Sequence, residues 1–90
     1  MGTALIKLKI MPESPSEDLE NIKAESKKII EEKQGQKTAF EEKPIAFGLK
    51  SVIASFSLDE ENDLEEMQKA LGEISGVKSV EVEDMRRAFG

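Results

Sequence analysis

The sequence predicts an α+β domain with the element order β-α-β-β-α-β. Two observations carry this prediction: apolar residues alternate near both ends of the chain, and a helical pattern of apolar residues occurs twice between them. The length of 90 residues fits a single domain spanning 1–90 and leaves no room for two cores. Hydrophobic residues make up 38% of the chain and charged residues 36%, which allows a thin core.

The first strand and the first helix are predicted from their local patterns. A period of two at residues 4–10 indicates a strand with one buried face, and Met11-Pro12 ends it because proline cannot donate to a sheet. Ser14, Pro15 and Glu17 fit the N-cap, N1 and N3 positions of a capping box, which predicts that a helix begins there. Gly35 is expected at C′, just after this helix.

The second half of the chain predicts two strands, a helix and a last strand. Residues 38–43 and 46–58 are expected to be strands, separated by an interruption at Pro44. Asn62 or Asp63 can cap a second helix that Gly76 ends, and Val80 starts the alternation of a last strand. The apolar stripe of the second helix consists of Leu64, Met67, Leu71 and Ile74.

Two such β-α-β units predict the ferredoxin-like arrangement, a four-stranded antiparallel sheet with two helices on one face. The other face of the sheet would then be open to solvent or to a partner.

The third strand contains a conflict in its apolar pattern. Ile45, Phe47 and Leu49 share one parity, whereas Val52, Ala54, Phe56 and Leu58 share the other. A bulge near Lys50 would direct both sets into the core. Alternatively, only the second set is buried, and residues 45–49 present apolar side chains to a partner.

Composition excludes several classes of chemistry. The chain has no Cys, His, Trp or Tyr and no Gly-rich phosphate loop, so we expect no metal site, no cofactor and no enzymatic activity. The acidic turn at 59–61 is expected to be a solvated helix start. A net charge of −6 disfavours nucleic-acid binding, and no segment predicts a membrane span or a leader. We therefore expect a cytoplasmic monomer.

Three segments resemble the archaeal elongation factor 1-beta family: IMPESP at 10–15, PIAFGLK at 44–50 and VEDMRR at 82–87. The resemblance runs over residues 4–88 and implies the ferredoxin-like fold. It also implies guanine nucleotide exchange on the GTPase elongation factor 1-alpha, by protein–protein binding and without covalent chemistry.

The resemblance also implies which residues contact the GTPase. Phe47 matches an aromatic residue that packs against the GTPase in eukaryotic relatives, and the same surface is expected to include Ile45, Gly48 and Lys50. Arg87 matches a lysine that reaches the magnesium site, and Arg86 takes this role if the register differs by one residue. We expect the arginine and the neighbouring ring of Phe47 to form one tip.

Alternative interpretations remain open from the sequence alone. Phe47 could be a core residue, since Phe is commonly buried, and Arg86-Arg87 could be a solvated tail. A ferredoxin-like domain with an open sheet could also be a regulatory or small-ligand-binding module, which predicts self-association or ligand-dependent stability.

Overall fold

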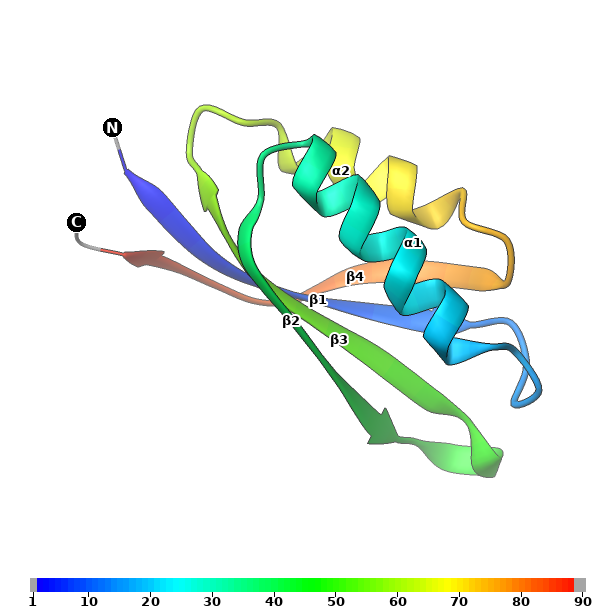
Figure 1. The fold of residues 1–90 in the computed structure, drawn as a ribbon. Helices are drawn as coiled ribbons and strands as arrows, with labels where there is room; N and C mark the ends of the chain where they lie inside the picture. Colours follow the sequence, from blue (N-terminus) through cyan, green and yellow to red (C-terminus); the bar gives the residue numbers. More distant parts are fainter. Residues whose placement is uncertain (1, 89–90) are drawn as a thin grey trace.

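The computed structural model describes residues 2–88, which form a four-stranded sheet and two helices (Figure 1). The sheet has the order β2-β3-β1-β4, and each neighbouring pair of strands is antiparallel. Both helices cover the same face of the sheet. The predicted ferredoxin-like fold is therefore confirmed. The elements are β1 (Thr3–Pro12), α1 (Leu19–Glu32), β2 (Gln36–Pro44), β3 (Lys50–Asp59), α2 (Leu64–Gly72) and β4 (Val77–Ala88).

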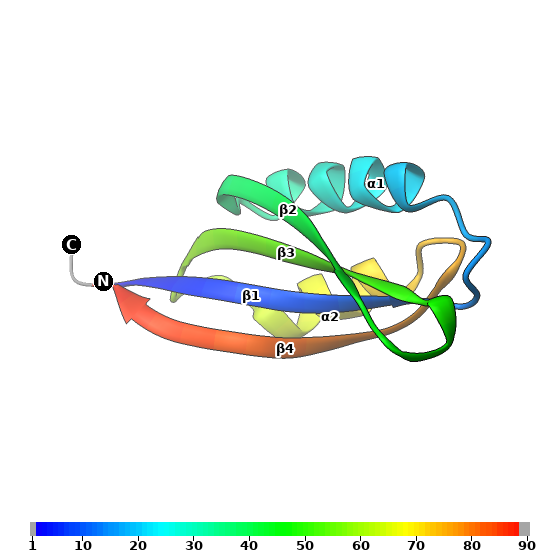
Figure 2. The ribbon, with the colours of Figure 1, turned by 90° about the horizontal axis from the view of Figure 1, so that it is seen from below.

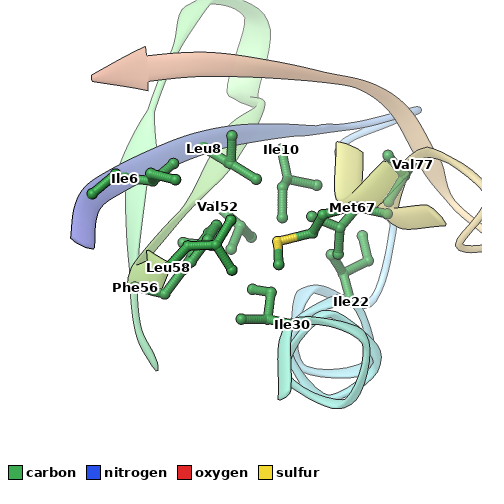
Figure 3. Close-up of a cluster of buried hydrophobic side chains, with 13 residues drawn as sticks. Ile6, Leu8, Ile10, Ile22, Ile30, Val52, Phe56, Leu58, Met67 and Val77 are labelled. Carbon is green, nitrogen blue, oxygen red and sulfur yellow. The ribbon is translucent and has the colours of Figure 1, made fainter. Parts of the chain in front are cut away.

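The core lies between the sheet and the two helices (Figure 3). The two central strands contribute alternate residues to it, as the period of two predicts, and α2 contributes Met67 and Leu71. From α1, Ile22 and Ile30 point toward the same cluster. The central strands contribute to the core cluster Ala4, Ile6, Leu8 and Ile10 of β1 and Val52, Ala54, Phe56 and Leu58 of β3.

The start of α1 differs from the prediction. The helix is capped by Asp18, whose carboxylate accepts hydrogen bonds from the backbone N–H groups of Glu20 (3.1 Å) and Asn21 (3.3 Å). Ser14 is not the N-cap, because its hydroxyl pairs with that of Ser16 at 3.0 Å within a turn. Ser14 and Asp18 can both accept hydrogen bonds from the unpaired N–H groups of a first helical turn, and in the structure Asp18, next to Leu19, does so.

The ends of both helices also correct the prediction. Gln34, with φ of 72°, occupies the left-handed C′ position of α1, and Gly35 follows it as C″. The N–H of Gly35 donates to Ile30 O at 2.8 Å, which completes a Schellman motif. Helix α2 ends at Gly72, and Gly76, with φ of 90°, forms the turn that leads into β4. The predicted N-cap Asp63 is confirmed.

The connection between β2 and β3 is a tight turn rather than a continuous strand. A single 3₁₀ turn (Ala46–Gly48) separates the strands, and β3 begins at Lys50. The bulge proposed near Lys50 is absent, because the pairing of β2 with β3 runs without a shift from Ala39 to Pro44, which pairs with Lys50. Val52, Phe56 and their neighbours alone fill the core, which leaves residues 45–49 outside it.

The chain termini and the β2–β3 turn lie at opposite ends of the long axis of the molecule. Figures 1 and 2 show both termini at one end of the sheet and the β2–β3 turn at the opposite end. This follows from the register, since Ala4 pairs with Leu58 on one side and with Arg87 on the other. The principal axis of the molecule is 41 Å long.

Candidate functional site

The first candidate surface is the hairpin tip, which we define as residues 45–49. Its base is closed by two backbone hydrogen bonds, from Ile45 N–H to Leu49 O (2.8 Å) and from Leu49 N–H to Ala46 O (3.3 Å). Phe47 lies at the apex and is 93% exposed. The core interpretation of Phe47 is therefore wrong, and the interpretation that residues 45–49 face outward fits the structure.

The backbone of the hairpin tip is strained at Phe47. Its φ of 63° and ψ of 32° lie in the left-handed region, which costs a residue with a Cβ roughly 1–2 kcal/mol. Gly48 follows with φ of 74°, a conformation that glycine adopts without such a cost. The ring of Phe47 therefore lies outside the core, above a strained backbone. Such a combination is typical of residues held for binding.

The second candidate surface is the C-terminal end of the sheet, which carries Arg87. The Nε of Arg87 donates to Oε2 of Glu60 at 2.6 Å. The side chain of Arg87 is 75% exposed, and no described residue hydrogen-bonds its terminal amino groups. Nε of the guanidinium is thus hydrogen-bonded, whereas its terminal amino groups can pair with a carboxylate or phosphate.

Arg86 lies on the other face of the sheet. Its Nε donates to Oδ2 of Asp84, two residues earlier in the same strand, at 3.0 Å. A bulge in β4 determines which face each arginine occupies. Leu8 pairs with Val82, but Lys7 pairs with Asp84, so β4 contains one extra residue here and its alternation of faces changes. Val80, Val82 and Arg87 consequently share the helix side, whereas Asp84 and Arg86 share the open side.

The same bulge places an apolar surface beside Arg87. Met85 is 54% exposed and Val82 is 42% exposed, and both lie on the helix side of β4. Helix α2 begins only at Leu64 and leaves this end of the sheet uncovered. A hollow of about 460 Å³ lies there; its lining includes Ala4, Ile6, Leu58, Asp59, Glu60, Asn62, Leu64, Met85 and Arg87. Sequence reasoning missed Met85, because simple alternation from Val80 and Val82 assigns it to the opposite face.

The structure does not bring Phe47 and Arg87 together. Arg87 lies level with Leu58, whereas the hairpin tip lies beyond Lys50, eight residues further along β3. At about 3.3 Å per residue the two surfaces are at least roughly 26 Å apart. The expectation of one tip formed by the arginine and the neighbouring ring is therefore wrong. Ile45, Gly48 and Lys50 accompany Phe47 at one end, and the arginines lie at the other.

An ion pair on the surface joins strand β2 to helix α1. Nζ of Lys23 in α1 donates to Oε2 of Glu42 in β2 at 2.6 Å and to Glu20 at 3.0 Å. The hydrogen bond from Lys23 lowers the pKa of Glu42, and the bonds to Glu42 and Glu20 raise the pKa of Lys23. This surface pair links the edge strand β2 to α1.

Comparison with known proteins assigns the chain. Residues 5–88 match the model of the EF-1 guanine nucleotide exchange domain. The chain belongs to this family. It is 41% identical to elongation factor 1-beta of Methanosarcina acetivorans over 91% of this chain and 93% of that protein. It is 39% identical to elongation factor 1-beta of Methanobrevibacter smithii, over 97% of this chain and 98% of that protein.

The archaeal relatives span nearly the whole length of this exchange domain, as Methanocaldococcus jannaschii elongation factor 1-beta also does at 35% identity. The resemblance found in the three sequence segments is thereby confirmed, and the domain is a guanine nucleotide exchange factor of translation elongation. In the part of the chain that the structure covers, neither helix has the length and apolar character needed to cross a membrane.

Proposed function

We propose that this exchange domain binds elongation factor 1-alpha in the cytoplasm, at two separate surfaces, and releases its GDP without covalent chemistry. The single 1–90 domain would act as a rigid bar whose hairpin tip grips the GTPase and whose C-terminal end perturbs the magnesium and phosphate site. One observation carries this proposal. At one end of the molecule Phe47 is exposed on a strained backbone, and at the other end Arg87 is hydrogen-bonded only through Nε in the part of the chain that the structure describes.

The hairpin tip would supply affinity. Nearly the whole ring of Phe47 is available for burial, and a rigid aromatic side chain loses little conformational entropy on binding. Ile45 and Leu49 at its base are half-buried and keep the turn attached to the sheet. Lys50, the first residue of β3, adds a positive charge three residues after Phe47, which suits an acidic rim on the partner.

The C-terminal end would supply the exchange step. GDP is held partly by Mg²⁺, which bridges its phosphates to the phosphate loop of the GTPase. A planar guanidinium fits a carboxylate or phosphate in a bidentate manner, whereas it is a poor substitute for the compact ion itself. Arg87 would therefore compete for the ligands of Mg²⁺, while Met85 and the hollow beside it bury apolar surface around the contact.

Linkage explains how binding becomes release. If the exchange domain binds the nucleotide-free GTPase more tightly than the GDP form, GDP must bind the complex more weakly by the same factor. Apolar burial at both ends contributes binding free energy to every complex. Only a contact that competes with the nucleotide's own ligands, such as that of Arg87, distinguishes the two forms.

The test is release of a fluorescent GDP from elongation factor 1-alpha, with Arg87→Ala compared with its matched control Arg86→Ala. Removing one partner of a desolvated charge pair costs at least about 2 kcal/mol, so Arg87→Ala should slow stimulated release roughly 30-fold or more. Arg86→Ala should retain stimulation, because its side chain lies on the open face. The reverse result would assign the exchange role to Arg86.

A further inference from the structure

Glu60 holds a position that a solvated helix start does not require. It follows β3 in the turn before α2, where its backbone N–H donates to Gly2 O at 2.9 Å. Its carboxylate lies against the backbone of Gly2: a Cβ added at Gly2 would come within 2.6 Å of Oε1. The same carboxylate accepts from Arg87 at 2.6 Å. Glu60 thus connects the β3–α2 turn, the start of β1 and the end of β4.

The bond between Glu60 and Arg87 uses one particular donor. It engages Nε, the inner nitrogen of the guanidinium, and no described residue hydrogen-bonds the two terminal amino groups. Arg has five N–H donors in a planar fork, and a hydrogen bond to Nε restricts the orientations that this fork can adopt. The side chain of Glu60 is 33% exposed and that of Arg87 is 75% exposed, so the carboxylate is less accessible than the guanidinium.

We propose that Glu60 is a positioning residue, which holds the guanidinium of Arg87 in its binding orientation before the GTPase arrives. This proposal rests on the proposed function, because it assigns Arg87 to the contact with the magnesium and phosphate site. An arginine that is already ordered loses less side-chain entropy on binding. For one long side chain this saving corresponds to about a three- to tenfold change in the strength of the contact that Arg87 makes in the release step.

Asp84 and Arg86 provide a matched control in the same strand. This pair also joins a carboxylate to Nε, and Arg86 is 76% exposed. It differs in that both partners belong to β4 and lie on the open face. Glu60→Gln and Asp84→Asn therefore remove equal charges from similar pairs, and only the first affects the orientation of Arg87.

The experiment measures fluorescent-GDP release from elongation factor 1-alpha against the concentration of exchange domain. Glu60→Gln should lower the maximal release rate three- to tenfold and leave the half-saturating concentration close to the wild-type value, because Arg87 acts in the release step. Asp84→Asn should match the wild type. Glu60→Gln combined with Arg87→Ala should be no worse than Arg87→Ala alone, since Glu60 acts through that side chain.

Three results would overturn the role of Glu60: unchanged kinetics in Glu60→Gln, faster release, or a further loss when Glu60→Gln is added to Arg87→Ala. Nitrogen relaxation at the Nε–H of Arg87 in the free protein provides an independent measurement. It should report an ordered side chain in the wild type and a mobile one in Glu60→Gln; a mobile wild-type Arg87 also overturns the proposal. If the wild type fails to accelerate release, the proposed function fails first.

Discussion

Replacing Phe47 by glycine should separate binding from folding, because the two effects have opposite signs. The side chain is 93% exposed and contributes no core packing, while its φ of 63° costs roughly 1–2 kcal/mol for a residue with a Cβ. Glycine removes that cost, but it makes the unfolded chain more flexible by about 0.5–1 kcal/mol. The net change in the free energy of unfolding should lie between zero and about 1.5 kcal/mol in favour of the variant.

The same substitution should weaken binding strongly. Complete burial of roughly 150 Å² of ring surface would contribute about 4 kcal/mol as an upper limit. An interface hot spot typically loses at least about 2 kcal/mol on truncation, which raises the Kd roughly 30-fold. Phe47→Ala removes the same ring but keeps a Cβ in the left-handed region, so it should bind as weakly as Phe47→Gly and melt at a lower temperature than that variant.

Two assays suffice: thermal unfolding of the three proteins, and titration calorimetry with elongation factor 1-alpha. For a domain of this size, 1 kcal/mol corresponds to roughly 4–8 °C in Tm. We expect a Tm for Phe47→Gly that equals or exceeds the wild-type value within this range. A Tm lowered by several degrees, with the Kd unchanged, would refute the reasoning, because the ring would then stabilise the fold and not the complex.

The remaining predictions concern the apolar surface, the ion pair and the core. Met85→Gln should raise the Kd for the GTPase several-fold, whereas Leu5→Gln, a comparably exposed site on the open face, should not; equal effects would exclude a specific contact. Glu42→Gln should flatten the pH profile of stability, since a lowered pKa gives stabilisation above pH 4.5 that is lost as the pH falls through the folded-state pKa; an unaltered profile would show that the bond to Lys23 is not formed in solution. Met67→Ala should destabilise the domain by about 2–5 kcal/mol in denaturant unfolding, and a smaller loss would mean that the core collapses around the site.

Strand β1 and helix α2 could be predicted from sequence because the spacing of their apolar residues matches the residues that are buried in the structure. Alternation in β1 and the stripe on α2 follow one buried face each, and Asp63 is the only strong acceptor directly before Leu64. The start of α1 could not be assigned by the same rule. Ser14 and Asp18 both precede helix-compatible residues, and the backbone bond from Glu13 N–H to Gly76 O (2.8 Å) helps to hold the intervening segment as a turn.

The geometry of the candidate site could not be predicted from the sequence. Phe47 in a left-handed conformation is not encoded by its own side chain; only the following Gly48 indicates a turn. The sorting of Arg86 and Arg87 depends on a bulge in β4, and no glycine or proline marks that bulge in the sequence. Charge and alternation alone therefore could not assign a face to either arginine or to Met85.

The separation of the two surfaces, in contrast, was available from the predicted fold. In an antiparallel sheet with β1 at its centre, β3 and β4 both run opposite to β1. The loop that starts β3 must then lie at the end where β1 finishes, and the end of β4 must lie where β1 starts. A single tip combining Phe47 with the last arginines is incompatible with this topology.

The concentration dependence of stimulated GDP release tests the two-surface account most directly. Phe47→Ala should raise the half-saturating concentration of exchange domain and reach the wild-type maximal rate at saturation. Arg87→Ala should lower the maximal rate, even where calorimetry shows the GTPase to be fully bound. If both variants change the same parameter, or if saturating Arg87→Ala releases GDP as fast as the wild type, the division into a gripping end and a releasing end is wrong.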